Sequence, residues 1–363
     1  MLKQVKISNF RNFDDEITID FSKVKDYSFN EECISNGLIN KAIIYGRNAM
    51  GKSNLGKAIV DIRSLLIDDN LALSNFFNAS TIKKVATFHY EFLLEQDEVV
   101  YSYQKNNQCE MLFEELYINN KKVFSYDFLN ESGDFEGLQF YEGTKTLNFT
   151  YWKNNKSVLK YIMNNSGGVE VLDKLMRFVG GMAVVRPSDV SVKFVGPRLV
   201  EKGIIQSLIE DNLIEEFEQF LASSGIDLPL SVDVKPDGQK SLYIRFNQPI
   251  EFVTYASSGT LALLGLFRII KSLDLITFLY IDEFDANFHF ELAEYILEYI
   301  KKNISIQTLI TTHNTDLMSN KYMRPDCYMI LTNGKLIPIA DATERELRQG
   351  HNLEKLYQSG EFN

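Results

Sequence analysis

The feature that most constrains this chain is a glycine-bounded loop that follows a short apolar run. Residues 41–45 (KAIIY) predict a buried strand, and GRNAMGKS follows at 46–53. The eight residues match GxxxxGK[ST], a phosphate-binding loop (P-loop) whose backbone amides and following helix N-terminus cradle phosphate oxygens. Lys52 would reach the β and γ phosphates, and Ser53 would ligate Mg²⁺. The predicted nucleotide-binding residues are Gly46, Arg47, Asn48, Ala49, Met50, Gly51, Lys52, Ser53 and Asn54.

A second motif lies near the other end of the chain. The apolar strand expected at 277–281 ends directly in Asp282 and Glu283. This is the Walker B arrangement, in which the first carboxylate holds Mg²⁺ and the second polarises the attacking water. An Asp-Glu pair at a strand end is common, but after a P-loop in the same chain it predicts a metal ligand at Asp282 and a catalytic base at Glu283.

Two further segments have a functional and a structural interpretation. His313 follows the strand expected at 307–310, where an imidazole can hydrogen-bond the γ phosphate and sense its loss. The alternative is a capping or core histidine. Ser257, Ser258 and Gly259 open a predicted helix, and such a start can bind an anion through amides and the helix dipole. The alternative is an ordinary N-cap.

Both chain ends predict parts of one α/β core, because strands and helices alternate in them. The N-terminal part contains short strands around 5–7 and 17–21, then the strand at 41–45 and a helix after the P-loop. The C-terminal part contains a helix running to about 271, strands at 277–281, 307–310 and about 327–331, and a helix at about 290–303. The helix after the P-loop carries apolar residues at helical spacing, which are Leu55, Ile59, Ile62 and Leu66.

The middle of the chain differs in amino-acid composition from the two ends and is expected to be an insert. Residues 85–150 are rich in Tyr, Phe and Val and are broken by Asn, Gly and Lys, which predicts an antiparallel meander. Residues 157–225 are expected to be mostly helical, and 230–246 to form a hairpin turning at 236–238. The predicted division is 1–80 and 251–363 for the two parts of the core, with 81–250 inserted between them.

Charge and cysteine content narrow the class of protein. The net charge is -11 and the isoelectric point about 5.1, whereas proteins that wrap nucleic acid are usually basic, so nucleic acid is possible as a partner but not indicated by charge. Cys33, Cys109 and Cys327 are scattered and form no CxxC pair, which predicts reduced thiols. The N-terminus lacks a signal-peptide core and no apolar run is long enough for a bilayer. We therefore expect a cytoplasmic protein with no membrane partner.

The order of these motifs resembles that of the ATP-binding-cassette (ABC) ATPases, and within them the SMC/RecF/OLD-like heads. The order is P-loop, long insert, Ser-Gly helix start, Walker B and histidine. The resemblance implies ATP and Mg²⁺ as ligands and an ATP-dependent homodimer, with higher assemblies possible. Residues 257–259 correspond to the signature motif, which contacts ATP held by a second subunit, and Asp285 in FDAN to the D-loop. For the Q-loop glutamine, Gln96, Gln104 and Gln108 remain alternatives.

More narrowly, several segments resemble AAA-type ATPases of bacterial phage-defence and abortive-infection systems. They are ISNFRNF at 7–13, GRNAMGKSN at 46–54, EFDANFH at 283–289, TTHN at 311–314 and GHNLEKLY at 350–357. This resemblance implies an ATPase or sensor subunit that controls a separate effector, a nuclease or a toxin. Alternatives are a RecF-like DNA repair clamp and a scaffold that binds ATP but barely hydrolyses it. Arg11 lies either near the nucleotide or on the solvated surface.

Overall fold

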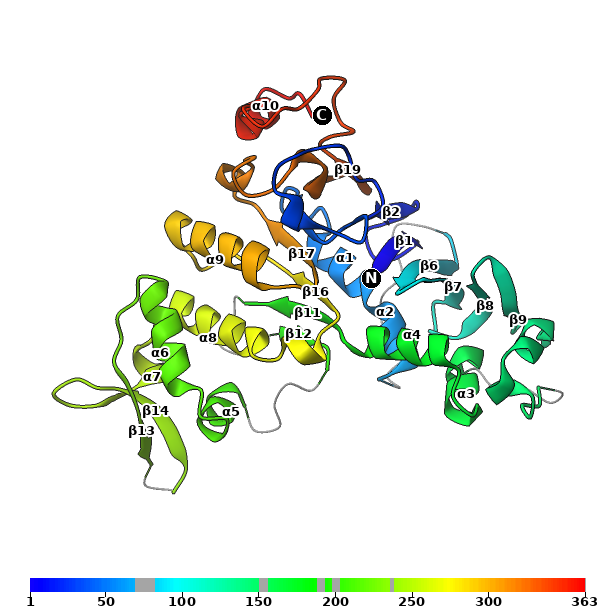
Figure 1. Ribbon diagram of the computed structural model, residues 1–363, viewed down its shortest axis with the longest axis horizontal. Helices are drawn as coiled ribbons and strands as arrows, with labels where there is room; N and C mark the ends of the chain where they lie inside the picture. Colours follow the sequence, from blue (N-terminus) through cyan, green and yellow to red (C-terminus); the bar gives the residue numbers. More distant parts are fainter. Residues whose placement is uncertain (69–81, 150–155, 188–192, 198–202, 236–237, 363) are drawn as a thin grey trace.

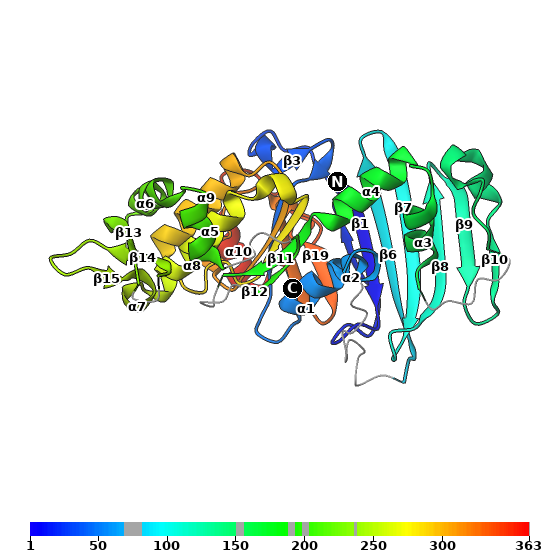
Figure 2. The same ribbon diagram turned by 90° about the horizontal axis from the view of Figure 1, so that it is seen from below.

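The computed structural model describes residues 1–68, 82–149, 156–187, 193–197, 203–235 and 238–362. Within these ranges the chain forms two seven-stranded sheets, a three-stranded sheet and a two-stranded one. Figures 1 and 2 show one large sheet at one end of the molecule, the other in the middle, and the three-stranded sheet at the opposite end. One hydrophobic cluster contains residues of both large sheets, so they share a core.

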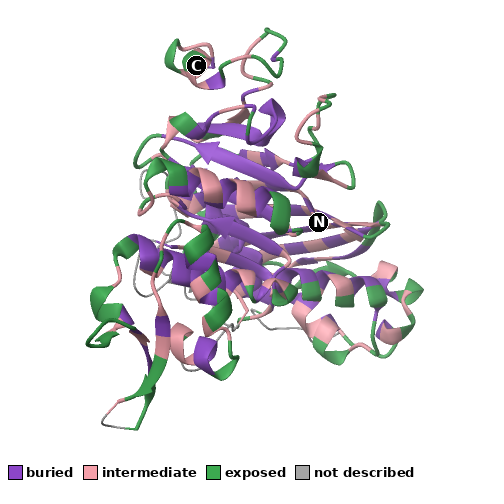
Figure 3. Cartoon of the chain, turned by 60° about the vertical axis from the view of Figure 1, so that its left-hand side comes forward, coloured by how far each residue is buried: buried purple, intermediate pink, exposed green. Residues whose placement is uncertain are grey.

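The middle sheet is mostly parallel and is built from both ends of the chain. Its five inner strands are parallel, and each edge strand is antiparallel to its neighbour. Every residue of β5, β16 and β17 is buried, as expected for parallel strands covered on both faces (Figure 3). In spatial order the strands are β12 (Lys193–Val195), β11 (Met182–Arg186), β16 (Phe278–Ile281), β17 (Gln307–Thr312), β5 (Lys41–Tyr45), β18 (Tyr328–Thr332) and β19 (Lys335–Pro338).

The other large sheet is antiparallel throughout and begins with the N-terminal strands. Buried and less buried residues alternate along β6, because one face packs on the core and the other meets solvent. In spatial order its strands are β10 (Ser132–Asp134), β9 (Lys121–Asp127), β8 (Met111–Ile118), β7 (Asp97–Asn106), β6 (Val85–Leu94), β1 (Leu2–Ser8) and β2 (Ile17–Asp20). The predicted meander is therefore confirmed from 85 to 134.

Beyond residue 134 the prediction of further strands is wrong. Residues 136–140 and 142–144 form the 3₁₀ helices η2 (Glu136–Phe140) and η3 (Glu142–Thr144). The aromatic side chains here pack on one another instead of extending the sheet, with Phe135 stacked on Phe149 at a ring-centroid distance of 4.0 Å and also packed against Tyr126 of β9. The last part of the predicted meander, from residue 150, lies outside the described residues.

A strand of the middle sheet was missed in the region predicted to be mostly helical. Helices α3 (Val158–Asn165) and α4 (Glu170–Gly180) are present, but β11 (Met182–Arg186) then pairs in parallel with β16. Its run of four apolar residues is too short for periodicity to distinguish a buried strand from a buried helix. The block 81–250 is therefore not a continuous insert, since it contributes two strands, β11 and β12, to the middle sheet.

The remaining elements cover the sheets or form a separate lobe. The helix predicted after the P-loop is present but breaks at Val60, with all four of its predicted apolar residues buried. The predicted hairpin is present as β13 and β14, while its turn residues 236 and 237 lie outside the described residues. The helices and small strands are α1 (Lys52–Ile59), α2 (Asp61–Leu66), α5 (Ile204–Glu210), α6 (Ile214–Ser223), α7 (Phe252–Tyr255), α8 (Ser258–Ile270), α9 (Phe290–Asn303), α10 (Leu353–Gln358), β3 (Ile34–Ser35), β4 (Leu38–Ile39), β13 (Leu230–Val234), β14 (Lys240–Ile244) and β15 (Ile250–Glu251).

A buried glutamine joins the two large sheets. The Gln307 side chain accepts a hydrogen bond from the amide of Leu2 at 2.9 Å and donates to the carbonyls of Leu2 and Ile39. Strand β1 is thereby fixed against β17, the strand that carries His313 at its end. No disulfide joins Cys33, Cys109 and Cys327, all of which lie within the described ranges. No helix in the described ranges is long and apolar enough to cross a membrane.

Candidate nucleotide-binding site

The P-loop turns sharply between β5 and α1, and two of its residues have positive φ angles. Ala49 and Gly51 have φ angles of 66° and 104°. A Cβ at Gly51 would lie 2.2 Å from the side-chain nitrogen of Asn12, so a larger residue would displace Asn12 and strain the backbone at this positive φ. Asn12 donates to the carbonyl of Met50 at 2.8 Å and accepts from the side chain of Asn54 at 2.8 Å. The N-terminal segment thus fixes the loop from outside.

Helix α1 is held at its first residue by the Walker B strand. The hydroxyl of Tyr280 donates to the carbonyl of Lys52 at 2.6 Å. Gly56 makes room for this tyrosine, because a Cβ there would lie 2.6 Å from two of the ring carbons. The contact orients the start of α1, whose free amides face the loop.

Lys52 is almost entirely buried at the centre of the site. Its Nζ donates to the carbonyl of Gly46 at 2.7 Å and lies 2.8 Å from Nε2 of His313. Burial lowers the pKa of Lys52, partly offset by Glu283 and Asp282. An anionic ligand would stabilise the ammonium, so the lysine is poised to exchange its internal acceptors for phosphate oxygens.

The two carboxylates at the end of β16 are positioned by the neighbouring strand β17. The Thr311 hydroxyl donates to Oδ1 of Asp282 at 2.9 Å and accepts from the amide of Glu283 at 2.8 Å. Glu283 has a φ of 50°, a conformation that non-glycine residues rarely adopt. Strained backbone of this kind is concentrated at functional sites. The turn directs Glu283 toward the P-loop, where it lines the same pocket as Lys52.

Arg186 is a site residue that the sequence reasoning missed. It ends β11, forms an ion pair with Oε2 of Glu283, and its Nη1 lies 3.9 Å from Oδ2 of Asp282. The carboxyl ends of parallel strands meet at one edge of a sheet, where ligands bind. Had 182–186 been recognised as a core strand, that rule would have placed Arg186 here.

His313 lies beside Glu283 in the lining of the smaller pocket. Its Nε2 is 3.9 Å from Oε1 of Glu283. Burial and the adjacent Lys52 ammonium lower the pKa of His313 below its ordinary value. Because the ammonium can only donate, the nitrogen that faces it acts as an acceptor, so the imidazole is neutral in this arrangement.

Most of the predicted nucleotide-binding residues surround two adjoining pockets of about 160 and 700 Å³. Gly46, Arg47 and Met50 do not line either one, although Gly46 provides the acceptor for Lys52. The smaller pocket is lined by Asn48, Ala49, Gly51, Lys52, Ser53, Asn54, Glu283 and His313. The larger one is lined by Asn48, Ala49, Glu283, Asp285, Ala286, His313 and Asn314.

The residues available for Mg²⁺ fit that ion chemically. Ser53 offers a hydroxyl beside the loop, and Asp282 a carboxylate that is only 3% exposed. Magnesium prefers oxygen ligands and is usually held by one or two carboxylates together with substrate phosphates. The described residues contain no cluster of three or more His, Cys, Asp or Glu suited to a metal.

The segment predicted to act as a signature motif lies in a different pocket. Ser257 is the N-cap of α8, and its hydroxyl oxygen accepts from the amide of Thr260 at 3.1 Å, so the capping interpretation holds within one chain. This pocket of about 480 Å³ includes Ser257, Gly259 and Asn287 and shares no lining residue with the two P-loop pockets. The structure therefore does not bring the signature segment and the P-loop together within one copy.

Residues 285–287, in the segment predicted to be the D-loop, connect the two regions. Asp285 and Ala286 line the larger P-loop pocket, and Asn287 lines the signature pocket. Thr312 donates to Oδ2 of Asp285 at 2.6 Å, and burial raises the pKa of that carboxyl. A Cβ on Gly259 would lie 2.8 Å from the carbonyl of Asn287, so the D-loop packs directly on the start of α8.

The structure shows where Arg11 and the three candidate Q-loop glutamines lie relative to the P-loop. Arg11 is near the nucleotide loop, because its Nη1 donates to Oδ1 of Asn54 at 3.4 Å. Gln96, Gln104 and Gln108 all lie in or beside β7 of the antiparallel sheet, and none lines the P-loop pockets. None of the three is thus favoured as a Q-loop residue.

Comparison with known proteins identifies the fold. Residues 185–319 match a family model described as "AAA domain, putative AbiEii toxin, Type IV TA system". No protein of curated function gives a significant sequence match. Among solved structures, an SMC head bound to the C-terminal winged-helix domain of ScpA gives a TM-score of 0.52 at 15% identity, covering 93% of this chain and 96% of that one.

Two further solved structures cover similar shares of both chains. A Pyrococcus furiosus Smc head with an extended coiled coil, bound to the C-terminal domain of ScpA, gives a TM-score of 0.49 at 12% identity, with coverage of 93% and 95%. The recombination mediator protein RecF gives 0.42 at 15% identity, with coverage of 94% and 98%. The first SMC head match shows that this chain has the fold of an SMC-type ATPase head, which confirms the predicted fold class and resemblance.

Proposed function

We propose that this protein is an ATP-hydrolysing switch in which two copies close head to tail around two ATP molecules. The observation that carries the proposal is the convergence of Lys52, Glu283 and His313 on one small pocket beside the P-loop. Asp282 and Thr311 lie directly behind Glu283. The fold of an SMC-type head supports the same reading.

Different side chains of this protein bind the phosphates, hold the metal and activate the water during phosphoryl transfer. The loop amides and Lys52 bind the phosphates, while Ser53 and Asp282 would hold Mg²⁺. The ion would neutralise charge on the phosphate oxygens. Glu283, oriented by Thr311, accepts a proton from the attacking water, and the transferred phosphate remains hydrogen-bonded to Lys52. His313, neutral beside Lys52, hydrogen-bonds the same phosphate and loses that contact when phosphate departs.

The separate position of the signature segment supports the need for a second copy. Within one chain, Ser257 and Gly259 line a pocket distinct from the P-loop pockets. In a head-to-tail pair the Ser258–Gly259 turn of one copy covers the phosphates bound by its partner, and the arrangement is repeated at the other site. Hydrolysis removes the γ phosphate that joins the copies, and the pair loosens.

The dimer proposal is tested with Glu283→Gln, which keeps the shape of the side chain but cannot accept the proton. With ATP and Mg²⁺, light scattering should give twice the monomer mass for this variant and a monomer without ATP. Two variants serve as controls. Lys52→Ala should stay monomeric in both conditions, and Glu110→Gln, which alters an exposed acid between β7 and β8, should behave as wild type. A Glu283→Gln protein that hydrolyses ATP at the wild-type rate would remove Glu283 from the mechanism, and one that stays monomeric with bound ATP would remove the closing pair.

For the biological role, we favour the sensor subunit of a phage-defence system that holds or releases a separate effector. The family description over 185–319, which names a putative toxin of a toxin–antitoxin system, supports this role, and the net charge of -11 speaks against DNA coating. Tagged Glu283→Gln protein recovered from its native host with ATP should retain one stoichiometric nuclease or toxin-like protein. Recovery of DNA and recombination factors would instead indicate the RecF-like repair role.

A further inference from the structure

The carboxylate of Glu283 is held by the side chain of Arg186. Its Oε2 accepts a hydrogen bond from Nη2 of this arginine, which is the last residue of β11. Within the part of the chain that the structure describes, no other group hydrogen-bonds this carboxylate. Thr311 contacts Glu283 only through the backbone amide, so it fixes the turn and not the side chain.

This contact matters because the Glu283 side chain is not locked by packing. The side chain is 25% exposed, and a glutamate in such a position can rotate about several bonds. A guanidinium is planar and presents its donors in a fixed fork, so it orients a carboxylate better than a flexible ammonium does. Without Arg186 the carboxylate would be free to turn away from the pocket.

The two oxygens of Glu283 have different surroundings. Oε2 is bound to Arg186, which lines neither of the two P-loop pockets. Oε1 lies 3.9 Å from Nε2 of His313, and Glu283 and His313 both line the smaller pocket. Arg186 therefore holds the carboxylate from outside the pocket and leaves Oε1 on the His313 side.

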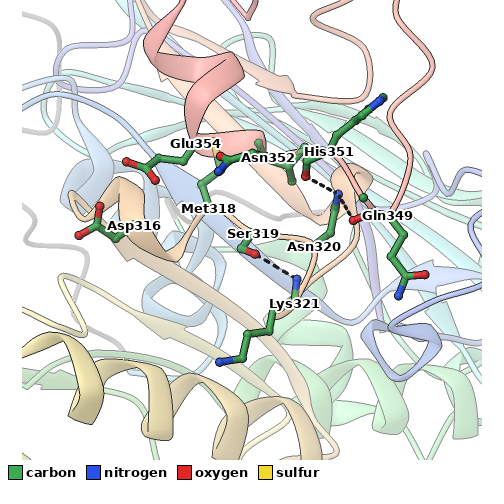
Figure 4. Close-up of a pocket in the computed structure, with 11 residues that line it drawn as sticks. Asp316, Met318, Ser319, Asn320, Lys321, Gln349, His351, Asn352 and Glu354 are labelled. Atoms are coloured by element: carbon green, nitrogen blue, oxygen red, sulfur yellow. Dashed lines mark hydrogen bonds between the residues drawn. The ribbon is translucent and has the colours of Figure 1, made fainter.

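The His313 side of the pocket has an anchor of its own. The 3₁₀ helix η5 (Thr315–Leu317) begins two residues after His313. The turn after η5 is tied to the C-terminal tail, because the amide nitrogen of Asn320 donates to the carbonyls of Gln349 and His351 at 3.2 and 3.3 Å (Figure 4). The base can therefore lose its own anchor without a displacement of this wall.

We propose that Arg186 is a positioning residue for Glu283, because its guanidinium holds Oε2 so that Oε1 faces the attacking water. The inference rests on the function proposed above, in which Glu283 accepts a proton from that water. A guanidinium that engaged both oxygens would restrain the base instead. Here only Oε2 is hydrogen-bonded, so the lone pairs of Oε1 remain available for the proton.

The test measures steady-state ATP hydrolysis by the full chain at saturating Mg²⁺, so that a change in metal affinity does not contribute. Arg186→Ala should lower kcat about tenfold or more and leave KM for ATP within about twofold, because the base is misplaced while phosphate binding is unaffected. The matched control, Arg177→Ala, removes an exposed arginine of α4 that lines neither P-loop pocket and should behave as wild type.

Chemical rescue distinguishes a positioning role from a merely structural one. Guanidinium chloride at about 20 mM, far below denaturing concentrations, should raise the kcat of Arg186→Ala about threefold or more. Urea has a similar planar shape without the charge, and at the same concentration it should not restore activity. Equal rescue by urea and guanidinium, a loss confined to KM, or a kcat equal to or above that of wild type would each overturn the inference.

Two further variants keep the test decisive. If Arg186→Ala does not fold, Arg186→Lys replaces it, since lysine keeps the charge and loses the planar fork. Its kcat should fall below that of wild type with KM unchanged, and a wild-type kcat would overturn the inference. Glu283→Gln separates this inference from the function on which it rests. If Glu283→Gln hydrolyses ATP at the wild-type rate, both fail, whereas if it is inactive and Arg186→Ala is fully active, only the positioning role fails.

Discussion

Replacing Arg186 by glutamine should increase the affinity of the nucleotide site for Mg²⁺. Arg186 is ion-paired with Glu283, and its Nη1 lies 3.9 Å from Oδ2 of Asp282, the carboxylate proposed to hold the metal. A guanidinium in this position competes with a divalent cation for the same carboxylates and adds a positive charge beside the ion. Glutamine has a shorter side chain, keeps an amide donor and removes the charge.

The magnitude follows from the separation and the exposure of the pair. Two unit charges about 4 Å apart interact by about 4 kcal/mol at an effective dielectric constant of about 20. The Arg186 side chain is 36% exposed, so solvent screens much of this interaction. Pairs near the surface typically contribute about 1 kcal/mol or less. An energy of about 1 kcal/mol corresponds to about a fivefold change in the metal concentration at half-saturation.

The assay is a titration with Mn²⁺ in place of Mg²⁺, in the presence of a non-hydrolysable ATP analogue, with free Mn²⁺ counted by electron paramagnetic resonance. Half-saturation should occur at about one-fifth of the wild-type concentration. Arg245→Gln is the control, because Arg245 is 58% exposed and pairs with Glu218, outside the P-loop pockets. If Arg186→Gln binds Mn²⁺ as wild type does, or more weakly, Arg186 does not compete with the metal and the reasoning fails.

The remaining predictions concern stability and its pH dependence. Gly56→Ala should reduce the free energy of unfolding, measured by urea denaturation, by about 1–3 kcal/mol. The reason is that the added Cβ would lie 2.6 Å from the Tyr280 ring. Gly350 has open space around it, so the control Gly350→Ala should show no comparable loss. Burial lowers the pKa of Lys41 to about 8. Between that value and the pKa of the lysine in the unfolded chain, the unfolded chain binds more protons than the folded protein, so the free energy of unfolding, measured relative to Lys41→Met, should rise by about 2 kcal/mol from pH 7 to 9.5. A difference between the two proteins that does not change with pH would contradict this. The lowered pKa of His313 means that, as pH falls, the unfolded chain takes up the proton before the folded protein does. Wild type should therefore lose stability more steeply than His313→Asn below about pH 6.5. Parallel curves of unfolding free energy against pH for the two proteins would contradict this.

The sequence predicted those parts of the site that local motifs encode. Lys52, Asp282 and His313 lie where the strand–loop patterns put them, because each follows a strand of one parallel sheet and such strand ends meet at one edge. Strand β11 and its terminal Arg186 were not predicted, since four apolar residues after a glycine pair fit a strand or a helix equally well. The orientation of Glu283 by Thr311 depends on pairing between β16 and β17, which no single segment specifies.

The antiparallel sheet shows a second limit of local reasoning. Runs rich in Tyr, Phe and Val and broken by Asn, Gly and Lys were enough to predict the meander, and burial alternates along β6. Past residue 134 the same aromatic composition gave 3₁₀ turns, because Phe135 and Phe149 stack on each other. Composition indicates burial in such a segment, but tertiary contacts decide whether the residues are buried in a strand or in a turn.

The D-loop has a consequence for how the sites fill. Asp285 and Asn287 are two residues apart in one turn, which is closed by hydrogen bonds from Ala286 to Glu283 and from Phe288 to Asp285. In the proposed head-to-tail pair, one end of this turn would face the nucleotide of its own chain, because Asp285 lines the larger P-loop pocket. The other end would face the partner's nucleotide, because Asn287 lines the signature pocket. So short a turn cannot move at one end alone. Occupancy of the first site should therefore raise the affinity of the second, and ATP binding should be cooperative, with a Hill coefficient that rises above one only at protein concentrations where pairs form.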